Sequence, residues 1–262
     1  MTAPKMLKSY PTINILGMNI LAMNKDKILA EIIHRIKSKK RGYICLPNVY
    51  SAVLFQKNEH FRNAMFAADF LIPDGLPLVW VSALKGQRID RIRGSDVMLT
   101  LCQLSSENGL SHYFYGGEPG IPEKLAAELK KKFPRLNVLG MYSPPFHLLT
   151  PEEDKEIVRG INEAEPDILW VALGNPKQEI WMYEYRNKLN VPVMIGVGAA
   201  FDFLSGNVKQ APKWIQDSGF EWLFRLAHEP RRLWKRYLWG NTMFFILVFM
   251  DLLKLPRKNL FQ

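Results

Sequence analysis

Asp74 has the clearest potential for proton-transfer chemistry in this sequence. It ends the apolar run Phe70-Leu-Ile-Pro and is followed by Gly75. A carboxylate at the carboxyl end of a parallel strand faces the edge where ligands bind. There it could act as a general base, a role typically worth about 100- to 10,000-fold in rate. The alternative is a cap for the next helix, worth about 1 kcal/mol, and the pattern leaves both open.

Asn48, Gln178 and Asp202 each come shortly after an apolar run of strand length. Their side chains therefore also belong to the edge where ligands bind. The amide of Gln178 could donate to a ligand, and the carboxylate of Asp202 could accept bonds from a sugar hydroxyl. Each has a structural alternative: a helix cap for Asn48, a structural or exposed amide for Gln178, and a turn or cap carboxylate for Asp202.

Arg91 and Arg93 come just before a predicted helix that begins near Ser95. A guanidinium group holds phosphate or carboxylate in a bidentate fork, and a helix N-terminus attracts anions. Surface charge plus a cap by Ser95 or Asp96 is the alternative. Gly117 belongs to Tyr115-Gly-Gly-Glu-Pro, which resembles a phosphate-facing loop but has neither the dinucleotide-binding nor the Walker spacing of glycines.

Apolar runs of strand length alternate with helical patterns over most of the chain. The runs lie around residues 13–20, 43–46, 70–72, 113–115, 136–141, 168–173 and 191–197, and helices are predicted at 24–40, 75–84, 95–108, 119–132, 151–164 and 178–189. This alternation predicts an α/β fold with a mostly parallel sheet flanked by helices. The polar residues above would then meet at one edge of that sheet.

The C-terminal part of the chain differs in charge and pattern. The 262 residues carry a net charge of +10, and residues 205–262 contain ten Lys or Arg against four Asp or Glu. A basic segment favours an anionic partner: nucleic acid, a membrane surface or a phosphorylated substrate. Residues 243–253 are almost wholly apolar, too few to cross a bilayer but typical of an interfacial helix. Packing on the domain or on a second subunit is the alternative.

Other classes of site find little support in the sequence. Cys45 and Cys102 lie in apolar surroundings without a CxxC spacing, which indicates buried, reduced thiols. We expect no signal peptide. No DxD, HExxH or Cys/His cluster occurs, so we expect no bound metal.

Several short motifs occur in an order that resembles the WecG/TagA/CpsF glycosyltransferases. The resemblance covers roughly residues 13–237. The motifs are Pro47-Asn48, Pro73-Asp74-Gly75, Arg91-Ile-Arg-Gly-Ser-Asp96, Tyr115-Gly-Gly117, Gly174-Asn-Pro-Lys-Gln-Glu179, Gly196-Val-Gly-Ala-Ala-Phe-Asp202, Ala211-Pro212-x-Trp214, Glu221-Trp222-Leu-x-Arg225 and Glu229-Pro230-x-Arg232.

The resemblance implies an inverting, metal-independent bacterial transferase that needs no cofactor. Such enzymes move a sugar from a UDP-sugar to a polyprenyl-diphosphate-linked saccharide, and work as peripheral proteins at the cytoplasmic face of the membrane. Their products feed surface glycans such as teichoic acid or exopolysaccharide. The implied organisation is a Rossmann-like catalytic domain at residues 1–206 and a helical, membrane-associating appendage at residues 207–262.

The resemblance also suggests roles for the candidate residues. It implies that Asp74 is the base, that Asn48 and Gln178 contact substrate, and that Arg91 or Arg93 holds a diphosphate. From their positions after strands, we expect Gly117 and Asp202 to contact substrate as well. The appendage arginines would meet the lipid diphosphate or the membrane; they are Arg225, Arg231, Arg232 and Arg236.

Leu46 departs from the family pattern, because many members have Thr two residues before the Asn. The loss of a hydroxyl leaves the donor sugar open between glucosyl, uronosyl and N-acetylmannosaminyl. An alternative function is a nucleotide-dependent oxidoreductase on the same type of sheet, but the sequence lacks the glycine-rich motif that binds the dinucleotide. A nucleic-acid-binding protein would use the basic tail, but the apolar run suits lipid better, so we expect no nucleic-acid partner. Homo-oligomerisation stays open.

Overall fold

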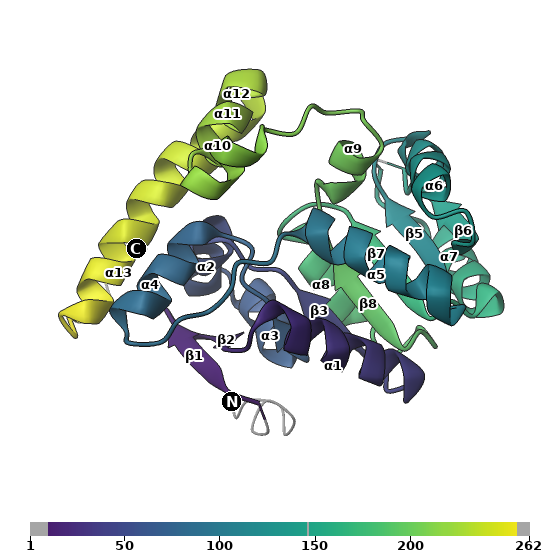
Figure 1. Ribbon diagram of the computed structural model, residues 1–262, viewed down its shortest axis with the longest axis horizontal. Coiled ribbons are helices and arrows are strands. Elements are labelled where there is room, and N and C mark those ends of the chain that lie inside the picture. The colour runs from purple at the N-terminus through teal and green to yellow at the C-terminus, as the bar shows by residue number, and fades with distance from the viewer. Residues whose placement is uncertain (1–9, 146, 256–262) are drawn as a thin grey trace.

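A six-stranded sheet forms the centre of the computed structural model, which describes residues 10–145 and 147–255. The strand order is β4-β3-β8-β7-β5-β6, and every pairing is parallel (Figure 1). The strands are β3 (Gly42–Cys45), β4 (Phe70–Leu71), β5 (Ser111–Gly116), β6 (Asn137–Tyr142), β7 (Ile168–Ala172) and β8 (Val193–Gly196). The predicted parallel α/β fold is confirmed, and it fits a Rossmann-like architecture.

Helices cover both faces of this sheet. One face packs against α2 (Val49–Lys57), α3 (Glu59–Ala67), α7 (Pro151–Ala164) and α8 (Lys177–Tyr185). The other packs against α1 (Lys25–Lys37), α5 (Gly94–Asn108), α6 (Ile121–Lys132) and α9 (Ala200–Leu204). Successive residues of a strand point to opposite faces, so Tyr43 and Cys45 join one core and Ile44 the other. Both cysteines are buried and unbridged, as the sequence indicates.

The direction of the connections changes at the middle of the sheet. The chain leaves β5 towards α6 on one face, and it leaves β7 towards α8 on the opposite face. Because β5 and β7 are neighbours, the loops at their carboxyl ends diverge. Such a switch point is where open α/β sheets bind ligands.

The run at residues 13–20 forms two strands where the sequence pattern predicts one. β1 (Thr12–Ile15) and β2 (Met18–Leu21) pair antiparallel in a separate hairpin. The chain reverses at Leu16 and Gly17, and Gly17 has a φ of 93°, a conformation that glycine tolerates. The Asn14 side chain accepts a hydrogen bond from the Gly17 amide at 3.1 Å. Periodicity alone did not reveal this turn.

The C-terminal helices lie along one side of the molecule (Figure 1). They are α10 (Lys213–Ser218), α11 (Glu221–His228), α12 (Pro230–Trp234), the π-helical turn η2 (Lys235–Trp239) and α13 (Gly240–Leu252). α13 packs against α2, and its buried residues Phe244, Leu247 and Val248 join the core. Over residues 10–145 and 147–255, no helix has the length and apolar character that crossing a membrane requires.

Candidate active site

A cavity of about 1530 Å³ opens at the carboxyl ends of the strands, between the sheet and the C-terminal helices. Small-molecule sites usually measure roughly 300–1,000 Å³, so this cavity has room for more than one substrate. It is lined by every candidate residue of the sequence analysis except Arg231. α4 (Leu76–Leu84), which follows Asp74, also contributes to its wall.

Asp74 lies half-buried in the cavity wall. It does not cap a helix, because α4 begins after Gly75 without a side-chain cap. None of the described residues hydrogen-bonds its carboxylate, and its amide donates to the Pro47 carbonyl at 3.0 Å. Burial raises the pKa of Asp74 to about 6, although the nearby Arg91 guanidinium opposes the shift. A carboxylate with this pKa is ionised at neutral pH and basic enough to accept a proton.

Asn48 is the cap of α2, which confirms its structural alternative. Its Oδ1 accepts from the amides of Tyr50 and Ser51 at 3.0 and 3.2 Å. Its loop packs directly against that of Asp74, since a side-chain carbon placed on Gly75 would lie 3.4 Å from Asn48 Cα. The cap therefore also sets the position of Asn48 beside Asp74 at the cavity.

Arg91 connects the Asp74 loop to the C-terminal helices. Its Nε donates to the Asp74 carbonyl at 2.6 Å, and its other nitrogens bind the Gln216 carbonyl and the Glu221 carboxylate, both at 2.7 Å. Arg93 similarly contacts Asp96 at 2.8 Å and the Gln216 side chain. Neither Ser95 nor Asp96 caps α5, whose N-cap is Arg93 without a side-chain cap bond.

Gln178 is buried at the start of α8, and it belongs to a polar network that the sequence pattern did not reveal. Gln178 Nε2 and Asn175 Nδ2 both donate to Glu179 Oε1, at 3.0 and 3.2 Å. Asn175 Nδ2 also donates to Ser51 Oγ at 3.0 Å, and Ser51 Oγ lies 3.4 Å from Asn48 Oδ1. The network therefore runs from Asn48 to Gln178 across the carboxyl ends of β3 and β7.

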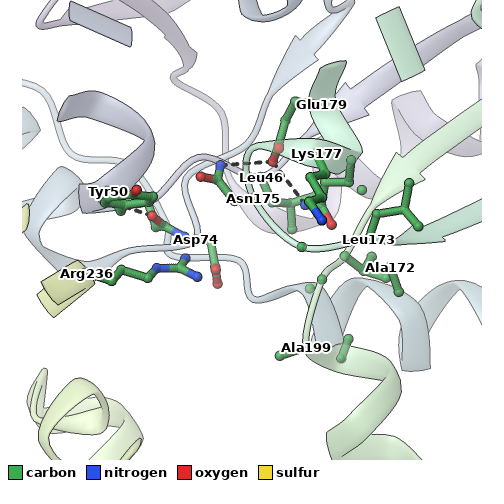
Figure 2. A pocket seen from close by; sticks show the side chains of 18 of the residues that line it. Leu46, Tyr50, Asp74, Ala172, Leu173, Asn175, Lys177, Glu179, Ala199 and Arg236 are labelled. Carbon is green, nitrogen blue, oxygen red and sulfur yellow. Dashed lines mark hydrogen bonds between the residues drawn. The ribbon is translucent and has the colours of Figure 1, made fainter. Parts of the chain in front are cut away.

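Glu179 is the centre of this network and is only 1% exposed. Burial raises its pKa, and the hydrogen bond from Gln178 opposes the rise. Figure 2 shows Glu179 joined to Asn175 by a hydrogen bond, with Asp74 and Arg236 on the far side of Asn175. The sequence could have indicated Glu179, because it lies in the first helical turn after a strand end and belongs to the same motif as Gln178, Gly174-Asn-Pro-Lys-Gln-Glu179.

Arg225 and Arg236 bring unpaired positive charge into the cavity. The Nε atom of each is buried and lacks a hydrogen-bond partner within the described chain. Their guanidinium groups lie over aromatic rings, Arg236 at 5.1 Å from Tyr50 and Arg225 at 5.3 Å from Phe203. Such groups can hold an anion in a poorly hydrated site.

The other two appendage arginines differ from this pair. Arg232 lines the cavity but is largely exposed and pairs with Glu229. Arg231 is exposed and does not line the cavity. Only part of the predicted cluster of arginines therefore faces the site.

Gly117 and Asp202 complete the candidate set. The Gly117 amide donates to the Ala172 carbonyl at 3.0 Å, which holds the end of β5 against β7. Asp202 lies in α9 and accepts from Asn207 Nδ2 at 3.3 Å, and burial raises its pKa. Leu46 lines the cavity just after β3. No group of His, Cys, Asp and Glu side chains within residues 10–145 and 147–255 is arranged to hold a metal ion.

Comparison with known proteins agrees with the resemblance. Residues 13–258 match the model of the Glycosyl transferase WecG/TagA/CpsF family. Two relatives, from Bacillus spizizenii and Bacillus subtilis, are named N-acetylglucosaminyldiphosphoundecaprenol N-acetyl-beta-D-mannosaminyltransferase. The first is 31% identical over 78% of this chain and 77% of its own length. The second is 32% identical over 78% of each chain.

Proposed function

Because the chain belongs to the WecG/TagA/CpsF glycosyltransferase family, we propose that it transfers a hexose from a UDP-sugar to a saccharide on polyprenyl diphosphate. The observation that carries the proposal is a cavity that combines the Asp74 carboxylate with Arg225 and Arg236. Among residues 10–145 and 147–255, nothing hydrogen-bonds that carboxylate or the Nε atoms of the two arginines. The two relatives are named for transfer to a saccharide on undecaprenyl diphosphate. That name supports a lipid-linked acceptor here.

In the proposed reaction Asp74 is the general base. It takes the proton of the acceptor hydroxyl, whose oxygen forms a bond to C1 of the donor sugar. The bond from C1 to the diphosphate breaks, and UDP leaves with its electron pair. Attack from the side opposite the leaving group inverts the configuration at C1. The raised pKa of Asp74, about 6, suits a base that works near neutral pH.

The cationic groups would stabilise the diphosphates of the two substrates. Arg225 and Arg236, with Arg232 at the cavity mouth, are proposed to hold the lipid diphosphate. Arg91 and Arg93 are the proposed contacts of the donor diphosphate, and Arg91 also fixes the Asp74 loop through its backbone bond. Charge stabilisation by fixed groups is usually a large part of catalysis, so no metal is required in this scheme.

The proposed acceptor is lipid-linked, and the outer side of the C-terminal helices fits a membrane surface. The exposed large apolar side chains of η2 and α13 that do not line the cavity are Trp239, Ile246, Phe249 and Leu252. Arg231 and Lys235 add positive charge that favours anionic headgroups. We propose that this surface lies in the interface of the cytoplasmic leaflet as a peripheral anchor.

A UDP-release assay with a panel of UDP-sugars and a short-chain polyprenyl-diphosphate saccharide tests the proposed function. We expect turnover with a matched donor and acceptor, and NMR of the product should show inversion at C1. Absence of release with every pair, or retention at C1, would contradict the proposal. The donor panel is needed because Leu46 removes the hydroxyl that many family members have at this position.

A further inference from the structure

Three buried oxygen atoms in the polar network lack a hydrogen-bond partner among the described residues. They are Asn175 Oδ1, Gln178 Oε1 and Glu179 Oε2, and all three residues line the cavity. Buried polar atoms without a partner are costly and rare in folded proteins. Three of them in one connected network at a cavity wall point to a partner that a ligand supplies.

Glu179 determines which atoms of the two amides are left unpaired. Glu179 Oε1 accepts hydrogen bonds from the NH2 groups of Asn175 and Gln178, so both amides turn their nitrogen atoms towards it. The bond from Asn175 Nδ2 to Ser51 Oγ holds that orientation. The carbonyl oxygens of the two amides consequently point away from Glu179 and offer hydrogen-bond acceptors at this wall. Such acceptors bind hydroxyl or N–H groups.

The network adjoins Asp74 and has open space beside it. It ends at Asn48, whose loop packs against Gly75. At the other end, a side-chain carbon on Gly198 would lie 3.5 Å from Gln178 Oε1. Because Gly198 has no side chain, a ligand hydroxyl can approach that oxygen with a small shift of the amide.

We propose that Glu179 is a positioning residue that orients the carbonyl oxygens of Asn175 and Gln178 into a subsite for the hydroxyl groups of a sugar ring. This inference rests on the proposed function. It adds that the residues after β7 and β8 recognise the sugar ring of a substrate. The reacting C1 must lie near Asp74, which the network adjoins, whereas the ribose of UDP is separated from C1 by the diphosphate. The ring belongs to the donor or to the acceptor, which have the same hydroxyl chemistry.

The test is Glu179→Gln, which keeps the shape of the side chain and replaces an acceptor with an NH2 donor. Calorimetry compares UDP-sugar with UDP, and a saccharide-bearing lipid diphosphate with the bare lipid diphosphate. We expect about tenfold weaker binding of the sugar-bearing member of one pair, equivalent to one lost hydrogen bond. Binding of UDP and of the bare lipid diphosphate should not change. If only UDP-sugar binds more weakly, the subsite holds the donor ring. If only the saccharide-bearing lipid diphosphate binds more weakly, the subsite holds the acceptor ring.

Glu163→Gln is the matched control, since Glu163 is exposed on α7, pairs with Arg159 and does not line the cavity. It should leave all four affinities unchanged. Equal weakening of UDP and UDP-sugar would assign the subsite to the nucleotide and overturn the inference. Unchanged affinities in Glu179→Gln, or a lowered melting temperature without a sugar-specific effect, would also overturn it. If the wild-type chain binds no UDP-sugar and no lipid diphosphate, the proposed function fails first and the inference fails with it.

Discussion

Arg91 and Glu221 form an ion pair of 2.7 Å that joins the loop of the candidate base to the C-terminal helices. The same guanidinium binds the Asp74 carbonyl, so one side chain contacts both parts of the site. This contact, together with the bonds of Arg91 and Arg93 to Gln216, therefore helps to fix Asp74 relative to the appendage arginines. A site divided between the sheet edge and a basic helical segment suits a soluble donor and a lipid-bound acceptor.

Asp74→Asn should retain the fold and lose most transfer activity. The amide keeps the shape of the side chain but cannot accept the hydroxyl proton, so we expect kcat to fall by about 100-fold or more. UDP release measures the loss, and thermal melting checks the fold. Asp26→Asn, an exposed aspartate in the first turn of α1, is the control. Near-normal turnover in Asp74→Asn would end its candidacy as the base.

The pH dependence of the reaction should reflect the raised pKa of Asp74. The base acts in its ionised form, so kcat/KM should rise with pH up to about 6 and then level off. An ordinary Asp with a pKa of 3.8 would place that rise more than a pH unit lower. A profile that is flat between pH 5 and 7 would be inconsistent with this assignment.

The raised pKa of Asp74 should also make the stability of the fold depend on pH, with stability falling as the carboxyl group ionises. The folded-state pKa of Asp74 lies above its unfolded value, so its contribution to stability is full below about pH 4 and is lost as pH rises through about 6. Asp74→Asn, which cannot ionise, should therefore melt at a higher temperature than wild type at pH 8. The two proteins should converge near pH 4. A lower melting temperature of the variant at pH 8 would contradict the burial argument.

The Arg91–Glu221 pair should couple the appendage to the catalytic loop. Both side chains are 17% exposed, and a charged hydrogen bond in such a setting contributes about 1.5–3 kcal/mol. Glu221→Gln and Arg91→Lys should each destabilise the protein and increase hydrogen exchange in α10 and α11. In a double-mutant cycle, the two effects should be clearly less than additive. Additive effects would show that the pair does not transmit this coupling.

Membrane binding should depend on the exposed side of α13 and not on its buried side. Ile246 and Phe249 are 40% and 62% exposed and do not line the cavity, so Ile246→Glu with Phe249→Glu should reduce recovery with anionic liposomes without unfolding the chain. Leu139→Glu, exposed on β6 at the opposite end of the molecule (Figure 1), is the control. Deletion of the whole helix is a poorer test, because Phe244, Leu247 and Val248 belong to the core. Unchanged flotation of the double variant would contradict the proposed anchor.

Much of the fold follows from local patterns in the sequence. Periodicity predicted the alternating strands and helices, and α7 begins at Pro151 and ends at Ala164 as expected. The pattern failed at residues 13–20, where a turn at Gly17 divides one apolar run into two strands. It also placed Asp74, Asn48 and Gln178 at one edge of the sheet, because parallel strands end on the same side.

The sequence by itself determined which residue types stand at the strand ends, since strand and helix periods are local properties of the chain. Only the tertiary structure decided what surrounds them. The burial of Glu179, the contact of Arg91 with Glu221 and the division of α13 into a core face and an exposed face all depend on segments far apart in sequence. Desolvation and pairing, which set the chemistry of charged groups, arise only when such segments pack together.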